Sequence, residues 1–275
     1  MLIRLLRARR VSPIGALLFV VALASLASGA CSTGPKLPPA GLMEADQWLF
    51  ERGTEALAER KWFAAREYFR RLVDGFPQSS HREDAKLGVG DTYIGENSIE
   101  SNILAINEFR EFLTFYPTHR RADYAQYKLG MAHFKQMRAP ERDQSETRSA
   151  IREFESFVTR YPNSTLMPEV KTHLRESHDR LSESEFLVGR FYYRINWYQG
   201  AEQRLKEVLK QDPAFTGRDD VYFYLGESLV KLGRQAEALP YFEKLIDEFE
   251  ESVHLEEARK RAELLKTQLQ ANKSQ

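Results

Sequence analysis

The sequence predicts an all-α protein built as an α-solenoid of helix pairs. Apolar residues recur at helical spacing from Met43 onward, one pattern of small and aromatic residues recurs along the chain, and alternating β-strand patterns with hairpin turns are missing. The stretch 150–162, AIREFESFVTRYP, shows the pattern at its clearest. Its apolar residues share one helix face and a proline ends the helix: Ala150, Phe154, Phe157, Tyr161 and Pro162.

Five helix pairs can be aligned, each with a glycine in its first helix and an alanine and a large apolar residue in its second. These positions are Gly53, Ala65 and Phe69; Gly90, Ala105 and Phe109; Gly130, Ala150 and Phe154; Gly189, Ala201 and Leu205; and Gly226, Ala238 and Phe242. A proline follows the second helix in the first four pairs, whereas the fifth has Glu250 there. Small residues let two helix backbones approach closely, and the large side chain fills the groove beside them. The pattern resembles the tetratricopeptide repeat (TPR), a helix-turn-helix unit.

The spacing of the pairs predicts two arrays. Residues 43–162 form an N-terminal array of repeats 1–3, and residues 163–184 form a connecting helix. Residues 185–275 form a C-terminal array of repeats 4–5 with a capping helix, because 253–270 carries one apolar stripe among charges. A polar stretch, 136–149, predicts a long loop inside repeat 3.

The beginning of the chain predicts a lipoprotein signal peptide over residues 1–30. Four arginines precede an apolar run at 14–30 that is short for a membrane span and ends in small residues. The sequence LASGAC resembles a lipobox, although Ser28 stands where the pattern prefers leucine. Cys31 is then the lipidation site, carrying N-acyl and S-diacylglycerol groups. An ordinary cleaved signal or an uncleaved anchor are the alternatives. Residues 31–42 would then be the lipidated cysteine and a flexible tether.

Composition and motifs favour binding over catalysis. Removing the first 31 residues leaves an acidic excess, whereas nucleic-acid binding requires a basic patch. The six histidines are scattered, and neither a phosphate-binding glycine loop nor a G-x-S-x-G motif occurs. We expect no enzyme activity, no metal and no cofactor apart from the covalent lipid.

The first helix of each pair lines the concave surface in a TPR superhelix. By register, Phe50, Leu57, Tyr124, Tyr127 and Phe134 are candidates for a groove that binds an extended client peptide. The alternative for each residue is packing against a neighbouring repeat.

Two segments, 142–164 and 191–213, resemble the BamD family of outer membrane protein assembly factors. The resemblance covers most of the mature chain. It implies a periplasm-facing lipoprotein on the cell outer membrane, a localisation that Ser32 after the cysteine also favours in such lipoproteins. It further implies a non-catalytic subunit of the β-barrel assembly (BAM) complex. In that family the C-terminal repeats bind the last POTRA domain of the barrel subunit BamA, the N-terminal repeats recognise client targeting segments, and accessory lipoproteins are further partners.

Carried over by position, Arg204 matches a family arginine that pairs with an acidic residue of the barrel subunit. The alternative is an ordinary solvated arginine. The sequence departs from the family pattern around Gly200 and in a more highly charged final helix. A function of another class also stays open: a TPR lipoprotein of cell-envelope or peptidoglycan organisation, or of polysaccharide export.

Overall fold

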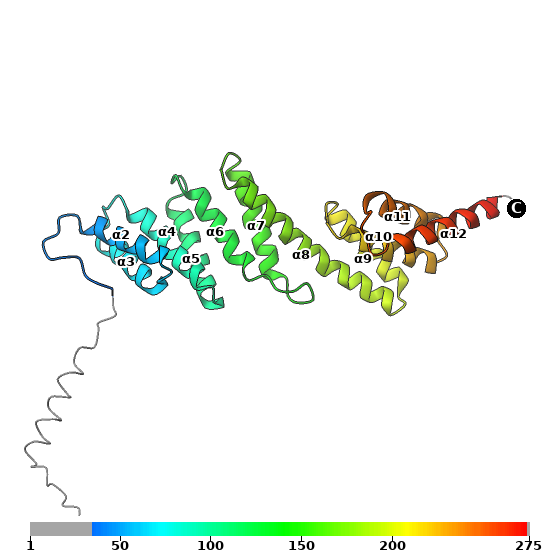
Figure 1. Ribbon diagram of the computed structural model, residues 1–275, viewed down its shortest axis with the longest axis horizontal. Coiled ribbons are helices and arrows are strands. Elements are labelled where there is room, and N and C mark those ends of the chain that lie inside the picture. Colours follow the sequence, from blue (N-terminus) through cyan, green and yellow to red (C-terminus); the bar gives the residue numbers. More distant parts are fainter. Residues whose placement is uncertain (1–34, 274–275) are drawn as a thin grey trace, which may run out of the picture.

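The computed structural model describes residues 35–273, which form eleven α-helices without a strand in that range (Figure 1). The helices are α2 (Ala45–Ala58), α3 (Trp62–Gly75), α4 (Arg82–Glu96), α5 (Ile99–Phe115), α6 (Ala122–Phe134), α7 (Ser145–Arg160), α8 (Met167–Arg194), α9 (Tyr198–Gln211), α10 (Arg218–Lys231), α11 (Gln235–Glu248) and α12 (Leu255–Lys273). The predicted all-α class is confirmed. The predicted signal peptide and the predicted lipidation site Cys31 lie outside the described residues.

The helices stack in chain order into an elongated body, as expected for a solenoid (Figure 1). Five pairs, from α2–α3 to α10–α11, are followed by α12. Because successive helices run antiparallel, the turns inside the pairs of the N-terminal half lie along one edge of the body. The turns between these pairs lie along the opposite edge (Figure 1).

Close contact between a glycine and a large apolar side chain holds each pair together. A Cβ atom on the glycine would lie only 2.5–2.7 Å from the nearest atom of that side chain. The contacts are Gly53 with Phe69, Gly90 with Phe109, Gly130 with Phe154, Gly189 with Leu205, and Gly226 with Phe242. All five large side chains are buried. The repeating pattern in the sequence therefore reports the contact that sets the distance between paired helices.

The long helix α8 belongs to both halves of the molecule. Near its start, Val170 packs with Phe154 and Phe157, and further on Phe186 enters the core of repeats 4 and 5. The boundary expected at 184/185 lies inside this one helix. The chain from Glu169 to Val188 contains neither proline nor glycine, so no residue stops the helix there.

The polar stretch in repeat 3 forms a shorter loop than 136–149, because α7 begins at Ser145. The Asp143 carboxylate accepts hydrogen bonds from the Ser145 backbone N–H at 3.1 Å and from its hydroxyl at 2.9 Å. The buried Gln144 amide donates to the carbonyls of Ala139 and Arg142, at 2.9 Å each. These contacts order the loop and give α7 an additional turn.

The predicted capping helix is α12. It buries Ala258, Ala262 and Leu265 against repeat 5. At its start His254 stacks on Phe223 with the ring centroids 4.1 Å apart. An apolar face is thereby closed at the C-terminal end of the solenoid.

Candidate functional site

The turn between α8 and α9 carries an exposed apolar surface beside a free arginine. We call the group Phe191, Ile195, Trp197 and Arg204 the α8–α9 turn surface. Its three apolar members are 53%, 52% and 53% exposed, respectively. Trp197 lies against Gly200, where a Cβ atom would come within 2.7 Å of the indole ring. A glycine at this position therefore lets the indole lie against the first turn of α9.

Arg204 lies on α9 and faces solvent. It shares a shallow cavity of about 270 Å³ with Tyr192, Trp197, Gly200, Gln203 and Glu207. Within residues 35–273 no ion pair or hydrogen bond of its guanidinium is found. On the same helix, by contrast, Glu202 is held by Lys206 and Arg234, with nitrogen–oxygen distances of 2.7 Å to each. Arg204 is thus available to a carboxylate from outside the chain.

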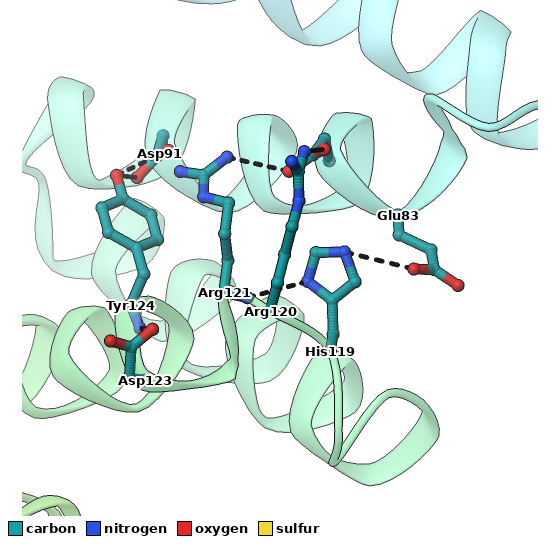
Figure 2. A network of polar contacts seen from close by, with 8 residues as sticks. Glu83, Asp91, His119, Arg120, Arg121, Asp123 and Tyr124 are labelled. Carbon is teal, nitrogen blue, oxygen red and sulfur yellow. Dashed lines mark hydrogen bonds and ion pairs between the residues drawn. The ribbon is translucent and has the colours of Figure 1, made fainter. Parts of the chain in front are cut away.

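Tyr124, a groove candidate, is part of a polar network between α4 and α6 (Figure 2). Its hydroxyl donates to the Asp91 carboxylate at 2.8 Å. The Arg121 guanidinium lies 4.4 Å from the centre of its ring. Burial, together with the Asp91 charge, raises the pKa of the Tyr124 hydroxyl. The ring therefore links repeat 2 to repeat 3.

The same network continues toward the turn before α6 (Figure 2). Asp84 accepts hydrogen bonds from Arg120 at 2.7 Å and Arg121 at 3.0 Å, and the His119 ring lies 3.2 Å from Glu83. Burial would raise the pKa of Asp84, but the two arginines outweigh it and the pKa is lowered. These contacts hold repeat 2 against repeat 3.

The other groove candidates also contact neighbouring helices. Tyr127 is 7% exposed and donates a hydrogen bond to Glu169 of α8. Phe50 stacks on His81 at 4.8 Å, and Leu57 packs against the N-terminal core. Phe134 lies 4.7 Å from the His173 ring. Each of the five groove candidates therefore contacts a neighbouring helix, and the groove itself stays a prediction.

Phe134 in addition lines a cavity of about 560 Å³ at the middle of α8. The apolar part of its lining comes from Phe134, Met137, Pro140 and Phe215. The charged part comes from Glu176, Asp179, Arg180 and Glu183 of α8. Burial, and then the charge of Asp220, raises the pKa of Glu183. Since three separate segments of the chain, 134–140, 176–183 and 215–217, form this cavity, the periodicity of one helix could not reveal it.

The exposed side chains of the α8–α9 turn and the cavity beside Phe134 suit the binding of a partner. Residues 35–273 hold no cluster of three histidine, cysteine or acidic side chains placed to bind a metal. Nor does any helix there have the length and apolar character needed to cross a bilayer. Two surfaces remain as candidate sites: the α8–α9 turn surface and the cavity beside Phe134.

Comparison with known proteins places the chain in a family. The family model YfiO, described as outer membrane lipoprotein, matches residues 43–239. The chain belongs to the YfiO family of outer membrane lipoproteins. The match begins just before α2 and ends inside α11, so it includes all residues of the α8–α9 turn surface.

Curated relatives carry the name outer membrane protein assembly factor BamD. The protein of Caulobacter vibrioides is 27% identical over 191 residues, which cover 69% of this chain and 61% of that one. The Xylella fastidiosa protein is 24% identical, with 68% of this chain and 66% of that one covered. The Haemophilus influenzae protein is 25% identical over 230 residues, with 80% and 85% covered. The chain thus spans less than two thirds of the length of the Caulobacter and Xylella relatives.

Among solved structures, the YfiO-family chain resembles the TPR2AB domain of yeast Sti1 in its complex with pHSP90. The two share 14% identity at a TM-score of 0.45, over 83% of this chain and 86% of that one. A thermophilic TPR protein of Thermus thermophilus shares 18% identity at a TM-score of 0.35, over 80% and 98% of the two chains.

Proposed function

We propose that the protein is a non-catalytic scaffold lipoprotein of the outer membrane β-barrel assembly complex. It is anchored to the periplasmic side of the outer membrane through lipid on Cys31, and it assists the folding and insertion of outer membrane proteins. Membership of the YfiO family and the curated relatives named BamD support this role. Accessory lipoproteins of the same complex are further partners.

The observation that carries the proposal is the unpaired Arg204 beside the exposed Trp197. A bidentate guanidinium–carboxylate pair is among the strongest directed contacts between proteins. Aromatic and arginine side chains are also enriched among the residues that dominate interface energies. We propose that the α8–α9 turn surface binds the last POTRA domain of a BamA-like barrel subunit, with Arg204 meeting an acidic residue there.

Charge reversal at Arg204 tests this docking. The lipidated chain is purified from solubilised membranes, and barrel-and-POTRA protein in the eluate is quantified. Arg204→Glu should lower the affinity by about 2–5 kcal/mol, because two acidic groups would then face each other. The matched control is Lys210→Glu on the same helix, whose side chain is 79% exposed and which should bind normally.

Two outcomes would count against the proposal. If the unmodified chain recovers no barrel-and-POTRA protein but does recover cell-wall enzymes or an export complex, a role in envelope organisation or polysaccharide export replaces it. If Arg204→Glu binds as well as Lys210→Glu while both remain helical by circular dichroism, the docking role of Arg204 is wrong.

We further propose that client targeting segments bind in the cavity beside Phe134. Its apolar lining offers a place for an aromatic or aliphatic side chain, and the carboxylates of Glu176 and Glu183 suit a neighbouring basic residue. Of the five groove candidates, Phe134 lies at this cavity. Phe50, Leu57, Tyr124 and Tyr127 do not line it and instead contact neighbouring helices.

A photocrosslinking residue at Met137 tests client binding. On ultraviolet irradiation with an unfolded outer membrane protein, we expect a crosslinked product that an excess of a peptide from the client's targeting segment suppresses. The same crosslinker at Phe115, which is 65% exposed on α5, is the control and should give little product. Equal crosslinking at the two positions would show that the cavity does not bind clients.

A further inference from the structure

The described residues Pro35 and Lys36, which precede α2, are held at one edge of the solenoid. The Lys36 backbone N–H donates to the Tyr68 hydroxyl of α3 at 2.9 Å. Pro35 and Lys36 also line one cavity with Glu59 and Lys61, which belong to the turn between α2 and α3. The first described residue of the chain therefore lies beside this turn, at the edge where the turns inside the pairs lie (Figure 1).

Three large apolar side chains are exposed on the same edge. Phe63 is 63% exposed at the start of α3, and Ile99 and Ile103 are 63% and 50% exposed in the first turns of α5. We call these three residues the Phe63–Ile103 patch. In the repeat alignment Phe63 and Ile103 each precede the small residue of their helix by two positions, so they are equivalent in repeats 1 and 2.

Contacts beneath the patch bring the two repeats together. The Trp62 indole lies against Gly95 near the end of α4, within 2.7 Å of where a Cβ atom would be. The Arg66 guanidinium pairs with Glu96 at 2.5 Å. Since Phe63 follows Trp62 and Ile99 comes three residues after Glu96, the patch spans the starts of α3 and α5.

Charges around the patch balance one another. Lys61 pairs with Glu59 at 2.6 Å, and Arg66 is committed to Glu96. Exposed Arg60 and Glu100 carry opposite signs. A strongly acidic or basic partner finds no complementary charge here, whereas the apolar patch suits the boundary between headgroups and acyl chains of a bilayer.

The short chain between Cys31 and Pro35 brings the headgroup–acyl boundary of the bilayer within reach of the solenoid. Only four residue steps separate Cys31 from Pro35, and an extended chain spans about 3.3–3.6 Å per residue, so the cysteine lies at most about 14 Å from Pro35. We propose that the Phe63–Ile103 patch rests on the lipid surface to which Cys31 is anchored. This inference rests on the proposed lipid anchor. The solenoid would then meet the membrane along the edge of repeats 1 and 2.

Depth-dependent quenching tests this contact in the full lipidated chain. Since Cys31 is the only cysteine and acylation consumes its thiol, a newly introduced cysteine is the single site for a fluorescent label. Phe63→Cys and Ile99→Cys are labelled and reconstituted into vesicles of zwitterionic phospholipid with nitroxide-bearing acyl chains. The control is Phe115→Cys, 65% exposed at the far end of α5, about 24 Å away along a helix that rises 1.5 Å per residue.

We expect quenching at positions 63 and 99 to exceed that at 115 several-fold and to persist at high salt, because the contact is apolar. If the labelled variants float with the vesicles but are quenched equally at all three positions, the proposed lipid contact is wrong, whereas the anchor at Cys31 still holds. If none of the variants floats with vesicles, the anchor at Cys31 fails, and this inference fails with it. Shielding of position 63 that persists in detergent without lipid would instead indicate a protein partner or a second copy.

Discussion

Arg175 of α8 and Asp212 at the end of α9 form a two-point ion pair at the junction of the two repeat arrays. The Arg175 Nη1 atom lies 3.0 Å from Asp212 Oδ1, and Nη2 donates to the second oxygen. Ser182 of α8 donates its hydroxyl to the same carboxylate at 2.7 Å. Between Val170 and Phe186, where α8 passes from one apolar core to the next, its buried side chains are serines. Polar contacts therefore fix the angle at which α9 leaves this helix.

Replacing Asp212 with asparagine should destabilise the protein by about 1–3 kcal/mol near neutral pH, because hydrogen bonds to a charged group would be lost at a nearly buried site. Urea unfolding followed by circular dichroism measures the change. Asp74→Asn is the control, since Asp74 is exposed at the end of α3. Equal midpoints for Asp212→Asn and the unmodified chain would contradict the structural role.

The pH dependence of the same pair has a defined sign. Burial would raise the pKa of Asp212, but Arg175 and Ser182 outweigh it, so the pKa in the folded state lies below the unfolded value. Its stabilising contribution is therefore present above the unfolded pKa and is lost as the pH falls through the folded pKa. The gap in stability between the unmodified chain and Asp212→Asn should accordingly be constant near neutral pH and shrink as the pH falls below the unfolded pKa of about 3.9. A gap that widens on acidification would overturn the argument.

The repeat pattern predicted most of the fold because each of its residues reports a local contact. Glycine, alanine and a large apolar residue at fixed offsets pair two helices, and five occurrences gave five pairs. The continuity of α8 is harder to predict. Polar residues at a repeat boundary look the same in the sequence whether the helix ends there or continues. In α8 the helix continues and buries Ser177, which donates to the His173 carbonyl, and Ser182, which donates to the Asp212 carboxylate.

Gly130→Ala should destabilise repeat 3. The new methyl group would lie 2.5 Å from the Phe154 ring, which is fully buried and has no space to retreat. Overpacking of this kind costs about 1–3 kcal/mol. The control is Gly75→Ala, because a methyl group at that glycine meets nothing within 4 Å. Thermal unfolding should show a lower midpoint for Gly130→Ala and no loss for Gly75→Ala; equal midpoints would refute the close-packing account.

The candidate site was harder to predict from the sequence than the fold was. Helical register places Tyr124 and Tyr127 on the first helix of repeat 3, but register cannot distinguish an open groove from contact with the next helix. Their partners, Asp91 and Glu169, lie 33 and 42 residues away. Arg204 came from family resemblance, and the exposure of Trp197 beside it became visible only once α8 and α9 were packed together.

Trp197→Ser should weaken docking to the barrel subunit at least tenfold while leaving the fold nearly unchanged. The indole contacts Gly200 and lies 4.6 Å from the Tyr192 ring, but more than half of its surface is exposed. A substitution at such a position typically changes stability by less than about 1 kcal/mol. Phe115→Ser removes a comparably exposed aromatic elsewhere and should bind normally. Biolayer interferometry with the isolated POTRA region measures the affinities. Equal binding by the two variants would exclude Trp197 from the interface.

Cys31→Ser should release the protein from the membrane or leave the signal peptide uncleaved, since no thiol remains to accept the diacylglycerol. The change is expected to be large, because each buried methylene contributes about 0.8 kcal/mol to anchoring and more than one acyl chain is lost. Labelling with palmitate, followed by membrane flotation, measures both effects.

Ser28→Leu is the matched control for this experiment, because it restores the residue that the lipobox pattern prefers three positions before the cysteine. Its labelling and flotation should equal or exceed those of the unmodified chain. Palmitate incorporation that survives in Cys31→Ser would place the lipid on another residue. The membrane contact proposed for Phe63 would then lose its geometric basis, because the 14 Å reach that supports it is counted from Cys31, at about 3.3–3.6 Å per residue.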